Sequence, residues 1–121
     1  MNDLTTTVDT YLAAWNETDR TARTALIEQA WSADGRLIDP PLAAEGHAGI
    51  DEMVAMVHQQ FPGHQFRRAS GIDAHHDHLR FAWELIGPDG AVAVAGMDVG
   101  EVGSDGRLRR ITGFFGDLPE A

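Results

Sequence analysis

The stretch "HLRFAWELIGPDG", residues 78–90, decides how the rest of the chain is read. Apolar side chains occupy every second position of its first part, and polar or small residues stand between them. This period of two is typical of a β-strand that buries one face. The "GPDG" that follows has the composition of a tight turn. The predicted buried face consists of Leu79, Phe81, Trp83 and Leu85.

The same pattern repeats downstream of this strand. The segment "AVAVAGMDVGEV", residues 91–102, predicts a second strand, and "GSDG", residues 103–106, predicts a second turn before a third strand over residues 107–115. Short turns of this kind join antiparallel neighbours. The second half of the chain is therefore expected to form an antiparallel meander.

Upstream of the meander the apolar spacing is helical. Residues 3–16 carry apolar side chains at helical intervals, which predicts a first helix. A second helix is expected to begin after Asp19 as N-cap and to end at Asp34-Gly35, with the glycine as C-cap. A short strand over residues 36–39 should follow. The residues that the second helix is expected to bury are Leu26, Ile27, Ala30 and Trp31.

A third helix is expected to open near Gly49 and to end at Pro62-Gly63. It would carry Asp51 and Glu52 in its first turn, where acids complement the helix dipole. No repeat or linker interrupts the chain, so residues 1–121 are interpreted as one domain. The predicted class is α+β, with three N-terminal helices packed on one face of a curved, mostly antiparallel sheet.

The composition argues against several classes of function. The chain has 121 residues, enough for one domain with a continuous core. Nine basic and nineteen acidic residues give 9 − 19 = −10, a charge that repels phosphate backbones and anionic lipid, so neither nucleic acid nor membrane is an expected partner. The absence of cysteine excludes thiolate chemistry. The first residues lack the pattern of a signal peptide or membrane span, which predicts a cytoplasmic protein.

Three polar residues stand where the pattern predicts apolar surroundings. Asp39 ends a strand next to Pro40-Pro41, which hold it in extended geometry, so it is either a turn residue or an acid directed at a ligand. Asp98 lies within an apolar strand, where desolvation raises the pKa of a carboxyl group, unless it serves as a structural polar residue or dimer contact. Tyr11 lies on the apolar stripe of the first helix, where a buried phenol needs a hydrogen-bond partner.

The segments "YLAAWNETD", "DGRLIDP", "GHAGIDEMV" and "MDVGEVGSDGRL" resemble the nuclear transport factor 2-like (NTF2-like) superfamily, from about residue 3 to residue 115. This group includes SnoaL-like proteins, ketosteroid isomerases and polyketide cyclases. The resemblance implies a cone-shaped fold with a pocket between helices and sheet. It implies that Asp39 is a base that moves a proton between carbons of a ketone. Tyr11 and a protonated Asp98 would donate hydrogen bonds to the developing oxyanion.

The chain departs from the isomerases at two positions. Those enzymes commonly place further tyrosines beside the catalytic one, whereas this chain has Trp31 and Val57 there. An epoxide hydrolase of the same fold would need an arginine between two acids, and Arg80 and Arg110 are the candidates by residue type.

The predicted function is acid/base proton transfer on a hydrophobic carbonyl compound, of the isomerase or polyketide cyclase kind, without cofactor or metal. The alternative is a non-catalytic ligand-binding or dimerisation module of the same fold. The resemblance also implies a homodimer. The residues expected to contact the hydrophobic small molecule are Trp15, Trp31, Met53, Val57, Phe81 and Trp83.

The histidines form a separate group of candidates. His75, His76 and His78 surround a predicted turn, where a solvated polar loop is expected and a metal site is the alternative. His47 and His58 are expected near the pocket, where imidazole could assist proton transfer.

Overall fold

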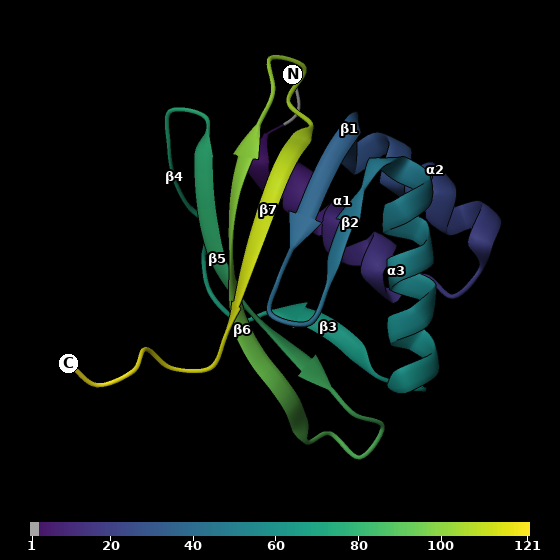
Figure 1. Ribbon diagram of the computed structural model, residues 1–121, viewed down its shortest axis with the longest axis vertical. Helices are drawn as coiled ribbons and strands as arrows, with labels where there is room; N and C mark the ends of the chain where they lie inside the picture. Colours follow the sequence, from purple (N-terminus) through teal and green to yellow (C-terminus); the bar gives the residue numbers. More distant parts are fainter. Residues whose placement is uncertain (1–2) are drawn as a thin grey trace.

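The computed structural model describes residues 3–121 and confirms the α+β class, with three helices packed on one face of a curved sheet (Figure 1). Two strands lie in the chain between the second and third helices, and the other five strands follow the third helix. The elements are α1 (Leu4–Asn16), α2 (Arg20–Ala30), β1 (Trp31–Ile38), β2 (Ala43–Glu45), α3 (Gly46–Gln60), β3 (Gln65–Arg68), β4 (Asp73–His75), β5 (His78–Ile86), β6 (Val92–Val102) and β7 (Leu108–Phe115).

The sheet is mixed, with the strand order β2-β1-β7-β6-β5-β3 and with β4 also paired to β5. The predicted meander is confirmed, since β5, β6 and β7 pair antiparallel in sequence order. The pairing of β1 with β7 is parallel, which the sequence pattern did not predict. This crossover brings the end of β1 beside the middle of β7, and it places residues from the two halves of the chain in contact.

The second helix begins after its predicted N-cap, Asp19, and the first helix begins after Asp3, which also acts as an N-cap. The Asp3 carboxylate accepts a hydrogen bond from the Thr6 amide at 2.9 Å, and the Asp19 carboxylate accepts one from Ala22 at 2.9 Å. Each bond satisfies an amide that has no partner within its helix. The helices have 13, 11 and 15 residues, and none within residues 3–121 is long and apolar enough to cross a membrane.

The predicted end of the second helix is wrong. Helix α2 ends at Ala30, and Trp31 already begins β1, which is longer than the short strand expected from residue 36. Gly35 is not a left-handed C-cap but lies beneath the Trp31 indole, where an ideal Cβ would stand 2.5 Å from Cε3. A buried tryptophan at position 31 fits both the helical spacing of α2 and the alternation of a strand. The apolar spacing therefore did not reveal the change from helix to strand.

Helix α3 begins earlier than predicted, at Gly46, whose φ of 76° favours glycine. Asp51 therefore lies in the second turn, where it does not complement the helix dipole. Its buried carboxylate accepts a hydrogen bond from Nε of Arg23 in α2 at 2.7 Å, and Arg20 lies 3.5 Å away. The acid thus joins two helices through a buried ion pair.

The hydrophobic core fills the space between the three helices and the sheet. Its members come from every layer, which is why the helices cannot be removed without exposing one whole face of the sheet. The largest side chains with almost no exposed surface are Trp31, Phe81, Ile27, Leu37, Ile50, Leu108 and Ile111.

Asn16 connects the end of α1 to the edge strand β3. Its amide nitrogen donates to the Phe66 carbonyl at 2.9 Å, and its amide oxygen accepts from the Phe66 N–H at 2.7 Å. The Asn16 side chain thus forms two hydrogen bonds with the Phe66 backbone, as a neighbouring strand would, and it fixes the position of Phe66 beside a cavity between the helices and the sheet.

Candidate active site

A cavity of about 500 Å³ opens between α1, α3 and the helix-covered face of the sheet. This volume is within the usual range for small-molecule sites. The titratable side chains of its lining are Tyr11, Asp39 and Asp98, and no arginine or histidine of residues 3–121 lines it. The lining residues are Tyr11, Leu12, Trp15, Leu37, Asp39, Pro41, Leu42, Met56, Val57, Gln60, Phe61, Phe66, Trp83, Leu85, Val94, Asp98 and Phe115.

Asp98 is buried in the pocket wall and accepts two hydrogen bonds from side chains. Tyr11 Oη donates to its Oδ2 at 2.7 Å, and Trp83 Nε1 donates to its Oδ1 at 3.0 Å. Helix α1 supplies the phenol, β5 the indole and β6 the carboxyl group. Only 6% of Asp98 is exposed, so these donors replace the water that an exposed carboxylate would have.

Burial displaces the pKa of two members of this group. Desolvation raises the pKa of Asp98 to about 6, against the hydrogen bonds from Tyr11 and Trp83, which lower it, while the nearby Asp39 charge adds to the increase. Burial and the Asp98 carboxylate also raise the pKa of Tyr11 well above its ordinary value. Tyr11 therefore remains a neutral phenol, whereas Asp98 changes its charge in the mildly acidic range.

A glycine opposite Trp83 allows the indole to reach Asp98. Gly96 pairs with Trp83 across β5 and β6, and an ideal Cβ at Gly96 would stand 2.4 Å from Cζ2 of the indole. The ring therefore lies directly over the glycine backbone, with its N–H directed at the carboxyl group two residues further along β6. A glycine within a strand often marks such a close approach.

Asp39 occupies a closed turn at the end of β1. Its N–H donates to the Leu42 carbonyl at 3.0 Å, and the Leu42 N–H donates to Asp39 Oδ1 at 2.9 Å. Oδ2 has no hydrogen-bond partner among residues 3–121. Partial burial raises the pKa of the carboxyl group, opposed by the Leu42 N–H. The turn thus fixes one oxygen and leaves the other available as a base.

Gly113 separates the two carboxyl groups. It pairs with Asp98 on β6, and its neighbour Thr112 pairs with Ile38 at the end of β1. An ideal Cβ at Gly113 would stand 3.0 Å from Asp39 Cβ and 3.1 Å from Asp98 Oδ1. Without a side chain at this position, Asp39 and Asp98 face the same part of the pocket floor.

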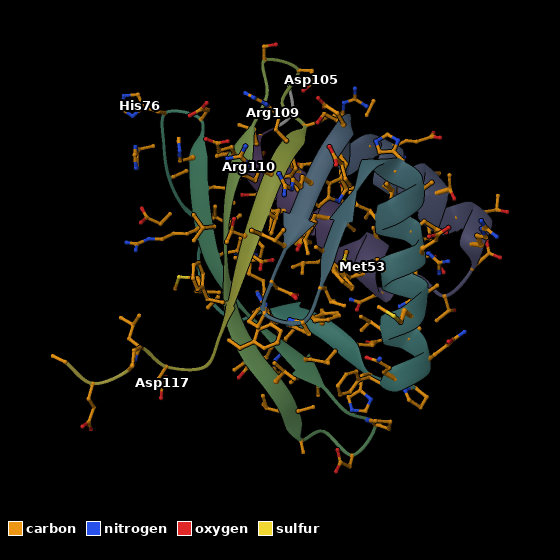
Figure 2. The ribbon with its side chains drawn as sticks, in the orientation of Figure 1. Met53, His76, Asp105, Arg109, Arg110 and Asp117 are labelled. Atoms are coloured by element: carbon orange, nitrogen blue, oxygen red, sulfur yellow. The ribbon has the colours of Figure 1, made fainter. Side chains whose placement is uncertain are left out.

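The predicted substrate-binding residues divide into two groups. Trp15, Val57 and Trp83 line the pocket together with Tyr11 and the two acids. The prediction is corrected for the other three, which lie in the core and not in the lining: Trp31, Met53 and Phe81. They are apolar and inward-facing as expected, but neighbouring side chains separate them from the cavity, and Figure 2 shows Met53 midway along α3.

Several lining residues were not found from the sequence. Phe61 follows α3, Phe66 lies on β3 and Phe115 ends β7, so they meet at the pocket only through the tertiary fold. Gly113 carried a signal, since a glycine inside the apolar strand "ITGFF" is typical of a close approach. The register that places it between two acids is not visible in the sequence.

The histidines lie outside the lining. The ring nitrogen Nε2 of His58 donates to the Trp15 carbonyl at 2.6 Å, and that of His47 donates to the Trp31 carbonyl at 2.9 Å, so both have structural partners. Figure 2 shows His76 at the outer tip of the turn between β4 and β5. Within residues 3–121 no three His, Asp or Glu side chains form a metal-binding group.

The two candidate arginines also lie away from the acids. Arg80 is exposed and donates to Asp73 at 2.8 Å, and the exposed Arg110 lies 4.0 Å from Glu101. Alternation explains both positions, because they lie on the face of β5 and β7 opposite the pocket. The arginine-linked pair of acids that epoxide hydrolysis would need is therefore not formed by these side chains.

A curved sheet covered by three helices, with an acid-bearing apolar pocket between them, defines a protein of the NTF2-like class. The SnoaL-like domain family matches residues 8–111, and the chain belongs to this family. The resemblance inferred from the sequence is thereby confirmed.

Solved structures agree with this assignment. A candidate isomerase of the SnoaL-like family from Agrobacterium tumefaciens is 41% identical, with a TM-score of 0.88 over 93% of this chain and 96% of that chain. An NTF2-like protein of unknown function from an Exiguobacterium species is 21% identical, with a TM-score of 0.73 over 93% and 99%. A candidate SnoaL-like polyketide cyclase from a Jannaschia species is 17% identical, with a TM-score of 0.69 over 95% and 90%. The last two show the fold alone, and no curated protein matches the sequence significantly.

Proposed function

We propose that this SnoaL-like protein catalyses proton transfer on a neutral, hydrophobic carbonyl compound. The observation that carries the proposal is the arrangement of Asp39, with one free oxygen, beside the buried Tyr11–Asp98 pair across Gly113. A base and an oxyanion donor are the two components that removal of an α-proton requires. The 41% identical relative described as a candidate isomerase supports the same class of chemistry.

The proposed reaction begins when Asp39 removes a proton from the carbon next to the carbonyl group. The electron pair of the broken C–H bond moves to the carbonyl oxygen, which Tyr11 stabilises by a hydrogen bond. In a ketone with a C=C bond next to the α-carbon, the protonated Asp39 then returns the proton to the far carbon of that bond, the carbonyl re-forms and the double bond shifts, which gives an isomer. Alternatively, the enolate carbon attacks a second carbonyl group of the same molecule and closes a ring, and the alkoxide formed takes the proton from Asp39, as in a cyclase. The higher pKa of Asp39 makes it a stronger base than an exposed aspartate.

The lining favours uncharged ligands. Aromatic and aliphatic side chains dominate it, and within residues 3–121 it contains no basic side chain that could neutralise a carboxylate or phosphate. The net charge of −10 repels anions further. We therefore expect neutral ketones of a few rings as the substrate class.

Exchange of α-protons provides the test. The ketone 2-tetralone, incubated in D₂O with the native protein, should incorporate deuterium faster than in buffer alone. Asp39→Asn should reduce this exchange by about 10²-fold or more, because it removes the base. Asp73→Asn, at an exposed acid on β4, is the matched control and should leave the exchange rate unchanged. Equal rates for Asp39→Asn and the native protein would contradict the proposal.

A non-catalytic binding module is the second candidate, and one observation favours it. Both side-chain donors at the pocket floor, Tyr11 and Trp83, already donate to Asp98. If the site only binds ligands, Asp39→Asn should keep the affinity for 2-tetralone, and the native protein should show no exchange above buffer.

We further propose that residues 1–121 act as one domain that forms a cytoplasmic homodimer through the outer face of the sheet. Met97 and Phe114 are paired on this face, and they are 39% and 58% exposed. Light scattering should give twice the mass of one chain, and Phe114→Glu should reduce it to one. A native mass equal to one chain would contradict the dimer.

A further inference from the structure

The nine basic residues of the chain are all arginines, and they fall into two groups. Six of them place a side-chain nitrogen within 3.8 Å of a carboxylate oxygen. The other three are Arg36, Arg109 and Arg110. Within residues 3–121, Arg110 reaches only Glu101, at 4.0 Å, and no carboxylate forms an ion pair with Arg36 or Arg109. In a chain with a net charge of −10, three guanidinium groups without a close counter-charge are the exception.

A bulge in β7 directs two consecutive arginines to the same face of the sheet. Along a regular strand, neighbouring side chains point to opposite faces. Here Glu101 of β6 pairs with Arg110, but the next residue of β6 pairs with Leu108. Arg109 is therefore an extra residue in β7, and it is exposed like Arg110, while Leu108 is completely buried. Figure 2 shows both arginines on the part of the sheet next to the turn that carries Asp105.

Arg36 of β1 adds a third guanidinium group from the neighbouring strand. It is the parallel partner of Arg110 across β1 and β7. Like charges at facing positions of neighbouring strands destabilise a sheet. An anion between the two side chains would remove this repulsion and accept hydrogen bonds from both of them. The pairing is thus unfavourable in an isolated sheet and favourable in a sheet that holds an anion.

The three arginines surround a hollow of about 170 Å³ on the face of the sheet opposite the active-site cavity. Two of its three acids have other partners. The Asp34 carboxylate accepts a hydrogen bond from Ser32 Oγ at 3.3 Å, and the Glu101 carboxylate lies 3.2 Å from His78 Nε2. The lining of this arginine hollow consists of Asp34, Arg36, Glu45, Glu101, Arg109 and Arg110.

We infer that the arginine hollow binds a small carboxylate that carries a hydroxyl or amino group beside its acid group. The planar guanidinium group matches a carboxylate in bidentate geometry. The lining acids accept hydrogen bonds, so they favour a donor next to the ligand carboxylate. They also disfavour a dianion such as phosphate, which adds two negative charges beside three carboxylates. The inference goes beyond the proposed function, because the cavity and its acids take no part in it.

Lactate, propionate and inorganic phosphate are the probes for the test. Titration with lactate at low ionic strength, followed by NMR, should shift the side-chain Nε–H resonances of Arg36, Arg109 and Arg110 along one saturation curve. The resonance of Arg80, which lies on the same face and donates to Asp73, should not shift. Propionate lacks the hydroxyl group and should bind at least about threefold more weakly than lactate. Phosphate at pH 7.5 should also bind more weakly than lactate.

Two variants test the role of the cluster. Arg36→Gln removes one guanidinium group and should weaken lactate binding by about tenfold or more. Its stability in urea should not fall, because the like-charge contact with Arg110 is relieved. Arg80→Gln, at an exposed arginine on the same face, is the matched control and should bind lactate with native affinity.

A comparison with the proposed dimer contact identifies what occupies the hollow. Phe114 lies on the same face as Arg110, four positions along β7, or about 13 Å in an extended strand. Phe114→Glu should bind lactate as the native protein does. Lactate binding by this variant alone would show that a second copy covers the hollow, and it would overturn the ligand site.

The remaining outcomes are equally decisive. Shifts of all exposed arginines without saturation, or native affinity in Arg36→Gln, would overturn the site. Equal affinities for lactate and propionate would overturn the contact with the acids, and tighter binding of phosphate than of lactate would overturn the choice of a carboxylate. The deuterium exchange of 2-tetralone is measured separately, so the failure of either proposal leaves the other intact.

Discussion

Asp39 and Asp98 are 59 positions apart in the chain and reach the same pocket floor across the single residue Gly113. The parallel pairing of β1 with β7 brings Asp39 to one side of this glycine, and the antiparallel pairing of β7 with β6 brings Asp98 to the other. The missing side chain allows both acidic side chains to lie close to the Gly113 backbone, where a Cβ atom would be crowded by each of them.

The first prediction concerns this glycine. Gly113 does not have a positive φ, so Gly113→Ala should fold, but its methyl group would press on Asp39 Cβ at 3.0 Å and on Asp98 Oδ1 at 3.1 Å. We expect the affinity for 2-tetralone to fall at least tenfold, with a stability loss of about 1 kcal/mol. Binding titrations and urea denaturation measure the two effects.

Gly49→Ala is the matched control for this substitution. Gly49 lies in α3 with open space around an ideal Cβ. Alanine there should stabilise the helix by about 0.5–1 kcal/mol and leave binding unchanged. Native affinity in Gly113→Ala would show that ligand binding does not depend on the positions of Asp39 and Asp98 beside this glycine.

The second prediction concerns the pH dependence of stability. The pKa of Asp98 is about 6 in the folded protein and has an ordinary value of 3.8. Between these values the folded state binds more protons than the unfolded state, so the contribution of this group to stability falls as pH rises from about 4 to about 6. The difference of about two pH units corresponds to ~3 kcal/mol.

Asp98→Asn isolates this contribution. The variant cannot titrate at this position. Its free energy of unfolding, relative to that of the native protein, should therefore rise with pH over the same window and then remain constant. Urea denaturation at intervals of half a pH unit measures it. A difference independent of pH would mean that Asp98 ionises as easily in the folded protein as in the unfolded chain.

The third prediction concerns the buried ion pair between α2 and α3. Asp51→Asn should cost about 3–5 kcal/mol, because it leaves the Arg23 guanidinium, with 5% side-chain exposure, without its counter-charge. Asp73→Asn breaks an ion pair of similar length with the exposed Arg80 and should cost less than about 1 kcal/mol. Thermal or urea denaturation of both variants gives the comparison, and equal losses would contradict the distinction.

The fourth prediction concerns the connection between α1 and β3. Asn16→Ala removes both hydrogen bonds to the Phe66 backbone and should cost about 1–3 kcal/mol. The Phe66 amide should also exchange its hydrogen faster, which NMR can follow. Gln65→Ala, at the exposed neighbouring position, should change neither quantity. Unaltered exchange at Phe66 would show that β3 is held without Asn16.

The sequence indicated Tyr11, Asp39 and Asp98 as candidates because each interrupts an apolar pattern with a group that is costly to bury. It did not reveal that Trp83 donates to Asp98, since a tryptophan on a buried strand face predicts packing equally well. The pattern predicted that Trp31, Met53 and Phe81 are buried, and it did not distinguish burial in the core from a place in the pocket lining. Burial is encoded in the period, but whether a buried side chain faces a cavity or another side chain is not.

The sequence by itself determined the Asp19 N-cap, the two tight turns and the alternation of the long strands, because these depend on residues within a few positions of one another. Only the tertiary structure decided where α2 gives way to β1, that β1 lies parallel to β7, and that Gly113 stands between two acids. Those features depend on strand register and on contacts between distant segments. A register is chosen by the packing of the whole core, and no local pattern records it.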